Sequence, residues 1–408
     1  MTKIRKQKTK TRKLESTLIY LLLQLILIGS LSSCRNSSSP STHFEETEGI
    51  LTIKNPSEPL HPSLALLFKE ELSIGVVEGD ENYMLGWHIL LNIDNQGNFY
   101  IGDVERAQIN KYDPQGNFLF TIGRRGQGPG EFQAISKIGF DEKDNLYVFD
   151  VKSQKISLFN PAGELIKEIK IFQFLEELTL NPHGYYLARK VDNIKLEASK
   201  KWDYTYGFFD QNFNFLHEIL RLPQEVTPAT TPYHLMADTL SKIAFQPQVS
   251  YDFDQEGNLY FGYPQTYEIK KYSPQGELIQ IIQRRYQPQK VTNRDKKYFQ
   301  QIQTTRMSNK FPPNQASKIF KLVKFPQFKP AYESFKVMDN GWLFVIVSSG
   351  PSEEKIIDLF DKEGIYIGQF KSKIPTEGLM FKGAKAYAVA TIDGYKFVKR
   401  YQYSRLKR

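Results

Sequence analysis

The chain has 408 residues, and its net charge of +9 is the sum of unlike parts. Residues 1–33 carry +6, residues 284–330 carry +11, and the rest of the chain carries the balance of −8. The positive charge is therefore confined to two segments, and the rest of the molecule is acidic. A single cysteine excludes an intramolecular disulfide, and the roughly 370 residues beyond the N-terminal segment can bury a large core.

The N-terminal segment predicts export. The stretch "MTKIRKQKTKTRK" is basic, "LIYLLLQLILIG" is an apolar run too short to favour a membrane span, and small residues follow. This order predicts a signal peptide over residues 1–33. The stretch "LSSC" at Leu31–Cys34 is similar to the bacterial lipobox, which implies cleavage before Cys34 and lipid attachment to its thiol. The alternative is a chance cysteine in an ordinary signal peptide.

The next segment connects this anchor to the folded part of the chain. Residues 34–59 are expected to form a flexible tether, because the stretch 35–48 is rich in Ser, Pro and acidic residues. The stretch "KEELSIGVVEG" (69–79) then predicts a β-strand.

A repeat runs through residues 60–408. Residues 94–127 align without a gap to residues 254–287, with 15 of 34 positions identical. A third copy spans residues 141–169, and weaker copies span 181–220, 338–370 and 382–401. Each copy alternates strand-forming runs with the turn sequences Asp-x-x-Gly and Asp-Pro-x-Gly.

This repeat predicts an all-β fold. Four short strands every 40 to 50 residues are typical of propeller blades, so six copies predict a six-bladed β-propeller of four-stranded antiparallel blades. A pair of β-sandwiches is the alternative, although sandwiches do not usually repeat at this period. Because an open edge strand invites aggregation, we expect the strand at 69–79 to complete the last blade beside residues 384–402.

The glycine-rich stretch "TIGRRGQGPGEFQAISKIGFD" (Thr121–Asp141) could be mistaken for a phosphate-binding loop. Such a loop needs a helix directly after it, whereas a strand follows here, and Pro129 removes one amide. We therefore predict that Gly123–Phe132 is the crossover between two blades. Its glycines allow positive φ angles, and Phe132 fills the space between the blades.

The repeat also resembles a known family. The stretch "GRRGQGPGEFQAISKIGFDEKDNLYVFDVKSQKISLFN" resembles an NHL-type repeat, and its loop is similar to that of six-bladed β-propeller lipoproteins (NHL/TolB-like) of Gram-negative bacteria. The resemblance covers most of residues 60–402, but only one copy carries the full glycine loop. It implies the fold and a place in the cell envelope, with the outer membrane favoured, and it implies no particular activity.

Two insertions interrupt the period, at residues 221–249 and 286–330. The first contains "TPYHLMADTLSKIAF" and the second "TNRDKKYFQQIQTTR", and both predict a helix. Thr292 or Asn293 is the expected N-cap of the second helix. Loops on a rigid scaffold often carry function.

The motifs of common enzymes are missing from the sequence. The six histidines show no metal-binding spacing, and no nucleophile elbow is present. We therefore predict no catalytic residue, no metal site and no cofactor. Asp103 and Asp150, which end strands in two copies, either line the mouth of the channel or close local turns.

Basic residues supply the candidate binding site. Arg124 and Arg125 are equivalent in the repeat to Arg284 and Arg285, three blades away, so we expect the two pairs to face each other across the channel. Together with Gln127 they are candidates for binding an anion. The alternative is that each arginine pair bonds acidic residues of the neighbouring blade and locks the ring.

The second insertion is the other candidate. Between residues 284 and 330, eleven net positive charges alternate with seven aromatic residues, which suits acidic glycans, phosphorylated lipid headgroups or an acidic protein surface. Export argues against nucleic acid as the ligand. The alternative is a solvated insertion whose aromatic residues pack on the propeller wall.

These features together predict a monomeric, exported, lipid-anchored propeller that acts as a binding or scaffold module. Its ligand would be an anionic glycan or an acidic envelope protein. The alternative is a propeller enzyme, a lyase or hydrolase acting on glycans or peptides at the channel mouth, because fold alone does not decide function.

Overall fold

The computed structural model describes residues 41–181, 183–196, 200–226, 231–307, 313–348, 350, 352 and 354–406. The predicted signal peptide, Cys34 and the first residues of the predicted tether lie outside the described residues. Within the described part of the chain, no helix has the length and apolar character needed to cross a bilayer.

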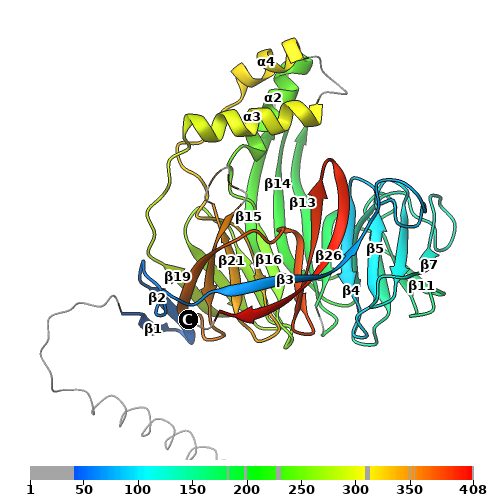
Figure 1. The fold of residues 1–408 in the computed structure, drawn as a ribbon, viewed down its shortest axis with the longest axis horizontal. Coiled ribbons are helices and arrows are strands. Elements are labelled where there is room, and N and C mark those ends of the chain that lie inside the picture. The colour runs from blue at the N-terminus through cyan, green and yellow to red at the C-terminus, as the bar shows by residue number, and fades with distance from the viewer. Residues whose placement is uncertain are drawn as a thin grey trace, which may run out of the picture. The chain divides into compact units, whose positions relative to one another are not determined.

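Six sheets, each built on four antiparallel strands, confirm the six-bladed β-propeller (Figure 1). The strands of blades one to three are β4 (Ile89–Ile93), β5 (Phe99–Asp103), β6 (Gln108–Tyr112), β7 (Phe118–Ile122), β8 (Ile135–Phe140), β9 (Leu146–Asp150), β10 (Lys155–Phe159), β11 (Leu165–Lys170), β12 (Leu175–Leu180), β13 (Tyr186–Leu196), β14 (Lys200–Phe209) and β15 (Phe215–Val226). Those of blades four to six are β16 (Ser250–Phe253), β17 (Leu259–Gly262), β18 (Glu268–Tyr272), β19 (Leu278–Arg284), β20 (Tyr332–Val337), β21 (Leu343–Val347), β22 (Lys355–Phe360), β23 (Tyr366–Ser372), β24 (Glu377–Lys382), β25 (Lys385–Ile392), β26 (Tyr395–Arg405) and β3 (Leu66–Ile74).

The aspartates of the repeat hold the turns between the strands. Asp94 Oδ1 accepts hydrogen bonds from the backbone amides of Gln96 (3.0 Å) and Asn98 (2.8 Å), and Gly97 takes a φ of 85°. An aspartate carboxylate folded back onto its own turn is a local arrangement that the sequence alone can specify. The same contacts recur at Asp113, Asp141 and Asp210.

The hydrophobic core lies between the blades. Tyr100 and Ile109 of blade one pack against Ile135 and Val148 of blade two, and all four side chains are buried. Each blade therefore depends on its neighbours, which is the physical reason for a closed ring.

The ring closes as the sequence predicts. Strand β3 pairs with β26 in antiparallel register, with Ser73 opposite Lys399, and so completes blade six. The strand spans Leu66–Ile74, so both its first and its last residue come earlier in the chain than in the predicted range of 69–79.

The prediction of a flexible tether over residues 34–59 is wrong for part of that segment. Strands β1 (His43–Thr47) and β2 (Ile50–Asn55) form a hairpin, and β2 pairs in parallel with β19, which gives blade four six strands. The Asn55 side chain, 4% exposed, donates to the carbonyls of Gln283 (3.1 Å) and Gly364 (2.9 Å). These contacts order the segment, because they satisfy backbone groups of two blades at once.

Within the described part of the chain three helices interrupt the strands, and two of them, α2 and α3, were expected from the two insertions. Helix α2 (Pro232–Ile243) has Thr231 as N-cap, and α3 (Asn293–Met307) begins at a reciprocal pair in which Thr292 Oγ1 accepts from the Asp295 amide (3.2 Å). Helix α4 (Pro313–Leu322) was not expected. The first insertion also begins later than predicted, because β15 continues to Val226.

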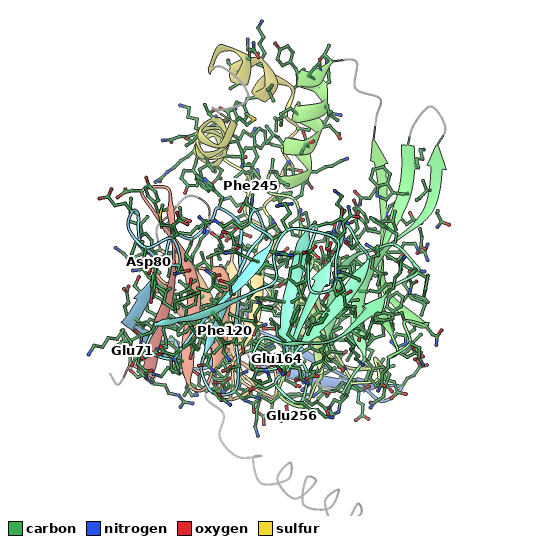
Figure 2. All side chains as sticks on the ribbon, turned by 90° about the vertical axis from the view of Figure 1, so that its right-hand side faces the viewer. Glu71, Asp80, Phe120, Glu164, Phe245 and Glu256 are labelled. Atoms are coloured by element: carbon green, nitrogen blue, oxygen red, sulfur yellow. The ribbon has the colours of Figure 1, made fainter. Side chains whose placement is uncertain are left out.

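The helices rise from one face of the ring, which we call the crossover face because the links between blades lie there. The helices and the long strands of blade three both extend above this face (Figure 1). Asp80 and Phe245, both in links, lie towards the helices, whereas Glu256, in an Asp-x-x-Gly turn, lies at the opposite end (Figure 2).

Candidate functional site

The arginines expected to face each other across the channel lie instead at the outer seams between blades. Arg284 is 10% exposed and forms a 2.6 Å ion pair with Asp358, a fully buried residue on β22 of the next blade. Its guanidinium also lies 4.3 Å from the centre of the Tyr366 ring. The placement of Arg284 at the channel was therefore wrong, and the alternative of a lock between blades describes it.

Arg124, the equivalent residue of blade one, has a different environment. Its side chain is 80% exposed, and Nε lies 2.7 Å from Glu131 Oε1 within the same crossover. Arg125 donates to the carbonyls of Gln133 (3.3 Å) and Glu105. Arg285 and Gln127 are exposed.

The order of strands in each blade is the reason that these residues miss the channel. The first strands of the blades contact one another and are innermost. Each arginine pair lies at or just after the end of the fourth strand, β7 or β19, so three strands of its own blade separate it from the channel.

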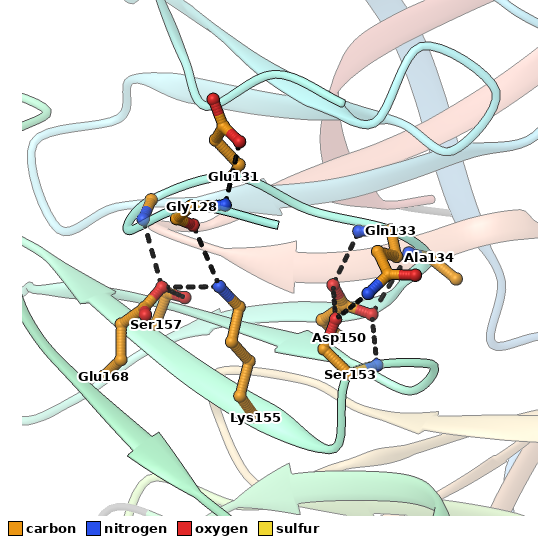
Figure 3. A network of polar contacts seen from close by, with 10 residues as sticks. Gly128, Glu131, Gln133, Ala134, Asp150, Ser153, Lys155, Ser157 and Glu168 are labelled. Atoms are coloured by element: carbon orange, nitrogen blue, oxygen red, sulfur yellow. Dashed lines mark hydrogen bonds and ion pairs between the residues drawn. The ribbon is translucent and has the colours of Figure 1, made fainter. Parts of the chain in front are cut away.

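The glycine-rich crossover is held by a dense polar network (Figure 3). Glu131 accepts from the Gly128 amide (2.8 Å), and this bond, followed by the Arg124 contact, lowers the pKa of Glu131. Glu168 Oε1 accepts from the Gly130 amide (3.0 Å) and from Lys155 Nζ (2.7 Å). Phe132 is fully buried between the blades.

Asp150 and Asp103 serve the same scaffold. The Asp150 carboxylate, fully buried, accepts from the amides of Gln133 (2.7 Å) and Ala134 (3.1 Å) and from the Ser153 side chain (2.9 Å). Asp103 accepts from the Arg106 amide (2.8 Å). Both aspartates therefore close local structure, which was the alternative to a place at the channel mouth.

The basic second insertion contributes two helices to a separate helical unit, which we call the cap (α2, α3 and α4). Its core joins Ala237 and Leu240 of α2 to Met307 of α3 and Ile319 of α4. Phe299, Phe320 and Phe325 belong to this core as well. Three aromatic residues of the insertion thus pack inside the cap, whereas Tyr286 packs on the propeller, with its ring centre 5.8 Å from that of Tyr267.

A groove of about 450 Å³ separates α3 from α4, and we call it the cap groove. Its lining combines two lysines with amide, hydroxyl and apolar groups: Lys297, Gln300, Gln301, Thr304, Ala316, Ser317, Phe320 and Lys321. Lys297 and Lys321 are both exposed, and neither forms an ion pair with any described residue.

The other cations of the cap follow the same pattern. Within the described part of residues 285–330, Lys329 is the cation with an ion pair, 3.0 Å from Asp295, and both side chains are buried. Five more exposed cations lack a carboxylate partner among the described residues of this range: Arg285, Lys290, Arg294, Lys318 and Lys324. Unneutralised charge at this density attracts anions.

A second cluster, which we did not predict, lies among the innermost strands. Arg189 bridges Glu177 (2.8 Å) and Glu176 (2.9 Å), while Lys137 lies 5.9 Å from the centre of the Tyr251 ring. Burial raises the pKa of Glu177 and lowers the pKa of Lys137.

This inner cluster supports a structural role. Thr179 and Tyr251 join blades three and four through a 3.0 Å hydrogen bond, and Asp252 accepts from the Val337 amide of blade five (3.0 Å). Three carboxylates, Glu176, Glu177 and Asp252, are balanced by Lys137, Arg189 and Lys336. We interpret the cluster as a polar plug of the channel.

A sequence signal for the plug existed. The first strand of each repeat is the innermost one, and the stretches "SKIGF", "EELTL" and "SYDF" place charged or hydroxyl-bearing residues in it. Polar residues within strands that surround a channel indicate a polar interior. Among the described residues, no group of three or more His, Cys, Asp or Glu side chains is placed to hold a metal ion.

Comparisons with known proteins agree with this architecture. Residues 87–256 match a family described as 6-bladed beta-propeller (DUF5128). A comparison with curated proteins found no match to the chain.

Solved structures of several bacterial proteins align with most of the chain. A Bacteroides fragilis protein described as exported is 13% identical, with a TM-score of 0.51, over 87% of this chain and all of that one. A Bacteroides vulgatus member of the DUF4221 family is 11% identical (TM-score 0.48; 84% and 99% covered). Virginiamycin B lyase of Staphylococcus aureus is 10% identical (TM-score 0.40; 83% and 99% covered). At 13% identity, the likeness to the Bacteroides fragilis protein concerns the fold alone.

Proposed function

We propose that the protein is exported, is held on a bacterial membrane by a lipid on Cys34, and binds an acidic glycan through its cap. The observation that carries this proposal is the set of exposed, unpaired lysines that line and flank the cap groove. The basic N-terminal segment, the apolar run and "LSSC" support export and the anchor.

Electrostatics favours an anionic ligand in the cap groove. Lys297 on α3 and Lys321 on α4 both line the groove, so a negatively charged chain lying in it can contact both helices. Each ammonium offers three hydrogen-bond donors, and a charge-assisted hydrogen bond contributes about 1.5–3 kcal/mol. The attraction acts over about 8–10 Å at moderate salt, so it also raises the rate of encounter.

The neutral side chains of the groove favour a sugar over a simple ion. Gln300 and Gln301 of α3 and Thr304 and Ser317 of α3 and α4 offer amide and hydroxyl groups, which both donate and accept hydrogen bonds. A polymer with carboxylate or sulfate groups among free hydroxyls matches this mixture. An exported protein meets such polymers outside the cytoplasm.

The architecture supports binding as the activity. The cap is assembled from two separate insertions that share one core, which holds α3 and α4 above the crossover face.

Removing the two groove lysines tests the proposal. We expect the double variant Lys297→Gln/Lys321→Gln to bind polygalacturonate and dextran sulfate at least about tenfold more weakly than the wild type, since two charge-assisted contacts are lost. Isothermal titration calorimetry at low and high NaCl measures this, and wild-type binding should weaken with salt.

The matched control is Lys152→Gln/Lys170→Gln. It changes the net charge equally, at two exposed lysines of blade two without ion pairs among the described residues. Its affinity should stay close to that of the wild type. Equal losses in both double variants, or a wild type that binds neither polymer at low salt, would overturn the proposal.

A further inference from the structure

A second recess lies where the ring closes, between blades six and one. It has a volume of about 400 Å³ and is formed by the link from β3 to β4 and by the turn between β25 and β26. We call it the seam pocket and propose that it binds the ring of a neutral sugar. The proposal is independent of the cap groove, which different residues form.

Exposed aromatic and aliphatic groups border the seam pocket. Trp87 is 64% exposed, and Tyr395 and Val77 are each 45% exposed. Burying these three side chains would be favourable, so their exposure beside one recess costs free energy. A cluster of exposed apolar side chains indicates an interaction site. The other two tryptophans, Trp202 and Trp342, are half-buried.

Polar groups beside these rings select the ligand. The Arg106 guanidinium donates through Nη1 to the Met84 carbonyl (3.0 Å), and its Nε lies 3.7 Å from Asp103 Oδ2, which leaves the N–H groups of Nη2 for a ligand. Asp393, at the tip of the β25–β26 turn, is exposed and has no partner among the described residues, so its carboxylate can accept. Lys396 is neutralised by Glu377 at 2.6 Å.

A pyranose ring matches this combination. One of its faces presents C–H groups, which pack on aromatic rings, and its hydroxyls both donate and accept hydrogen bonds. Arg106 and Asp393 supply one donor group and one acceptor group of opposite charge. Arg106 is also paired with Asp103, and Lys396 with Glu377. The recess therefore has no excess positive charge to attract an acidic polymer, and the sugar it suits is neutral.

The recess is preformed. Asp103 holds the Arg106 amide, and its carboxylate packs so closely on Gly86 that a Cβ there would lie 2.7 Å from Oδ2. The Val76 amide donates to the Tyr83 carbonyl (2.9 Å), which closes the β3–β4 link. A ligand therefore does not have to order the pocket, which favours binding. Asp103, a residue singled out from the sequence, is thus a positioning residue.

Trp87 provides a direct spectroscopic test. In the variant Trp202→Phe/Trp342→Phe, Trp87 is the one remaining tryptophan. Titration with cellohexaose, maltohexaose and N,N′,N″-triacetylchitotriose should give a saturable change in its emission with at least one of the three. The change should be insensitive to NaCl, in contrast to binding at the cap groove.

Calorimetry on single variants completes the test. Trp87→Ala should abolish binding of the responsive oligosaccharide, and Asp393→Asn should weaken it several-fold, while Phe172→Ala, which removes an aromatic ring that is 94% exposed elsewhere, should leave it unchanged. The cap variant Lys297→Gln/Lys321→Gln should also bind it normally. The absence of a saturable response to all three oligosaccharides, or an apolar peptide that binds at Trp87 and is not displaced by them, would overturn the proposal.

Discussion

Two arginines at equivalent positions of the repeat have opposite environments. Arg284 is enclosed by Asp358, Tyr366 and Tyr267, whereas Arg124 reaches over the surface to Glu131. The difference comes from the partner blade, because blade five places Asp358 where blade two places Ser157, which bonds Glu168 instead (3.0 Å). Equivalent positions in the repeat therefore predict where each arginine lies in its blade, but not which groups it binds.

We expect Arg284→Gln to lower the free energy of unfolding by about 3–5 kcal/mol, because it leaves the buried Asp358 carboxylate without its cation. Arg124→Gln should change it by no more than about 0.5 kcal/mol, since its ion pair is exposed. Urea denaturation followed by circular dichroism measures both. Similar losses for the two variants would contradict the assignment of Arg284 alone as a lock between blades.

At the scale of elements, the crossover between blades one and two shows why one repeat carries the full set of glycines. Gly123 has a φ of 73°, and a Cβ built on it would lie 2.2 Å from the Phe132 ring. The chain must turn sharply there while Phe132 fills the gap between blades. The glycines are therefore explained by backbone geometry and packing, as the sequence suggested.

We expect Gly123→Ala to destabilise the protein by about 1–3 kcal/mol more than Gly49→Ala. Both glycines have positive φ angles, of 73° and 80°, so both substitutions carry the cost of a left-handed backbone. Only at Gly123 does the new methyl group also meet a buried ring, because no atom lies within 4 Å of a Cβ at Gly49. Thermal and urea denaturation compare the two. Equal effects would show that Phe132 moves freely.

The cap and the N-terminal hairpin are the elements that the local sequence pattern did not fully predict. Helices α2 and α3 were both expected from the sequence, with Thr292 or Asn293 as the N-cap of α3. Their union into one core was not, because the residues that meet, such as Leu240 and Ile319, come from different insertions. Likewise, β2 pairs with a strand more than 200 residues away.

At the scale of the whole molecule, the proposed function depends on where the protein is kept. Lipidation of Cys34 would hold the propeller at a membrane, where the cap groove and the seam pocket face polymers of the envelope. Cys34→Ala, expressed in a Gram-negative host, should release the protein from the membrane fraction or leave an uncleaved precursor. Metabolic labelling with palmitate should mark the wild type and not the variant.

The control for this experiment is Ser33→Ala, which keeps the cysteine and replaces the small residue before it with another small residue. It should be cleaved, labelled and membrane-bound like the wild type. A Cys34→Ala protein that is correctly cleaved and still needs detergent to leave the membrane would contradict the lipid anchor.

The sequence by itself determined the repeat, the six blades, the closure of the ring by the strand that became β3, and the crossover at Gly123–Phe132. Turns built by Asp94 and Gly97, and strands of four to seven residues, depend on neighbours a few positions apart, so their patterns are visible in one dimension. Tertiary structure decided the rest. Packing between blades placed Arg284 at the seam beside Asp358, two distant insertions joined into the cap, and the meeting of β3, β25 and β26 placed Trp87 beside Asp393. Those contacts depend on how strands far apart in the chain are rotated and stacked, and no local pattern of residues encodes that geometry.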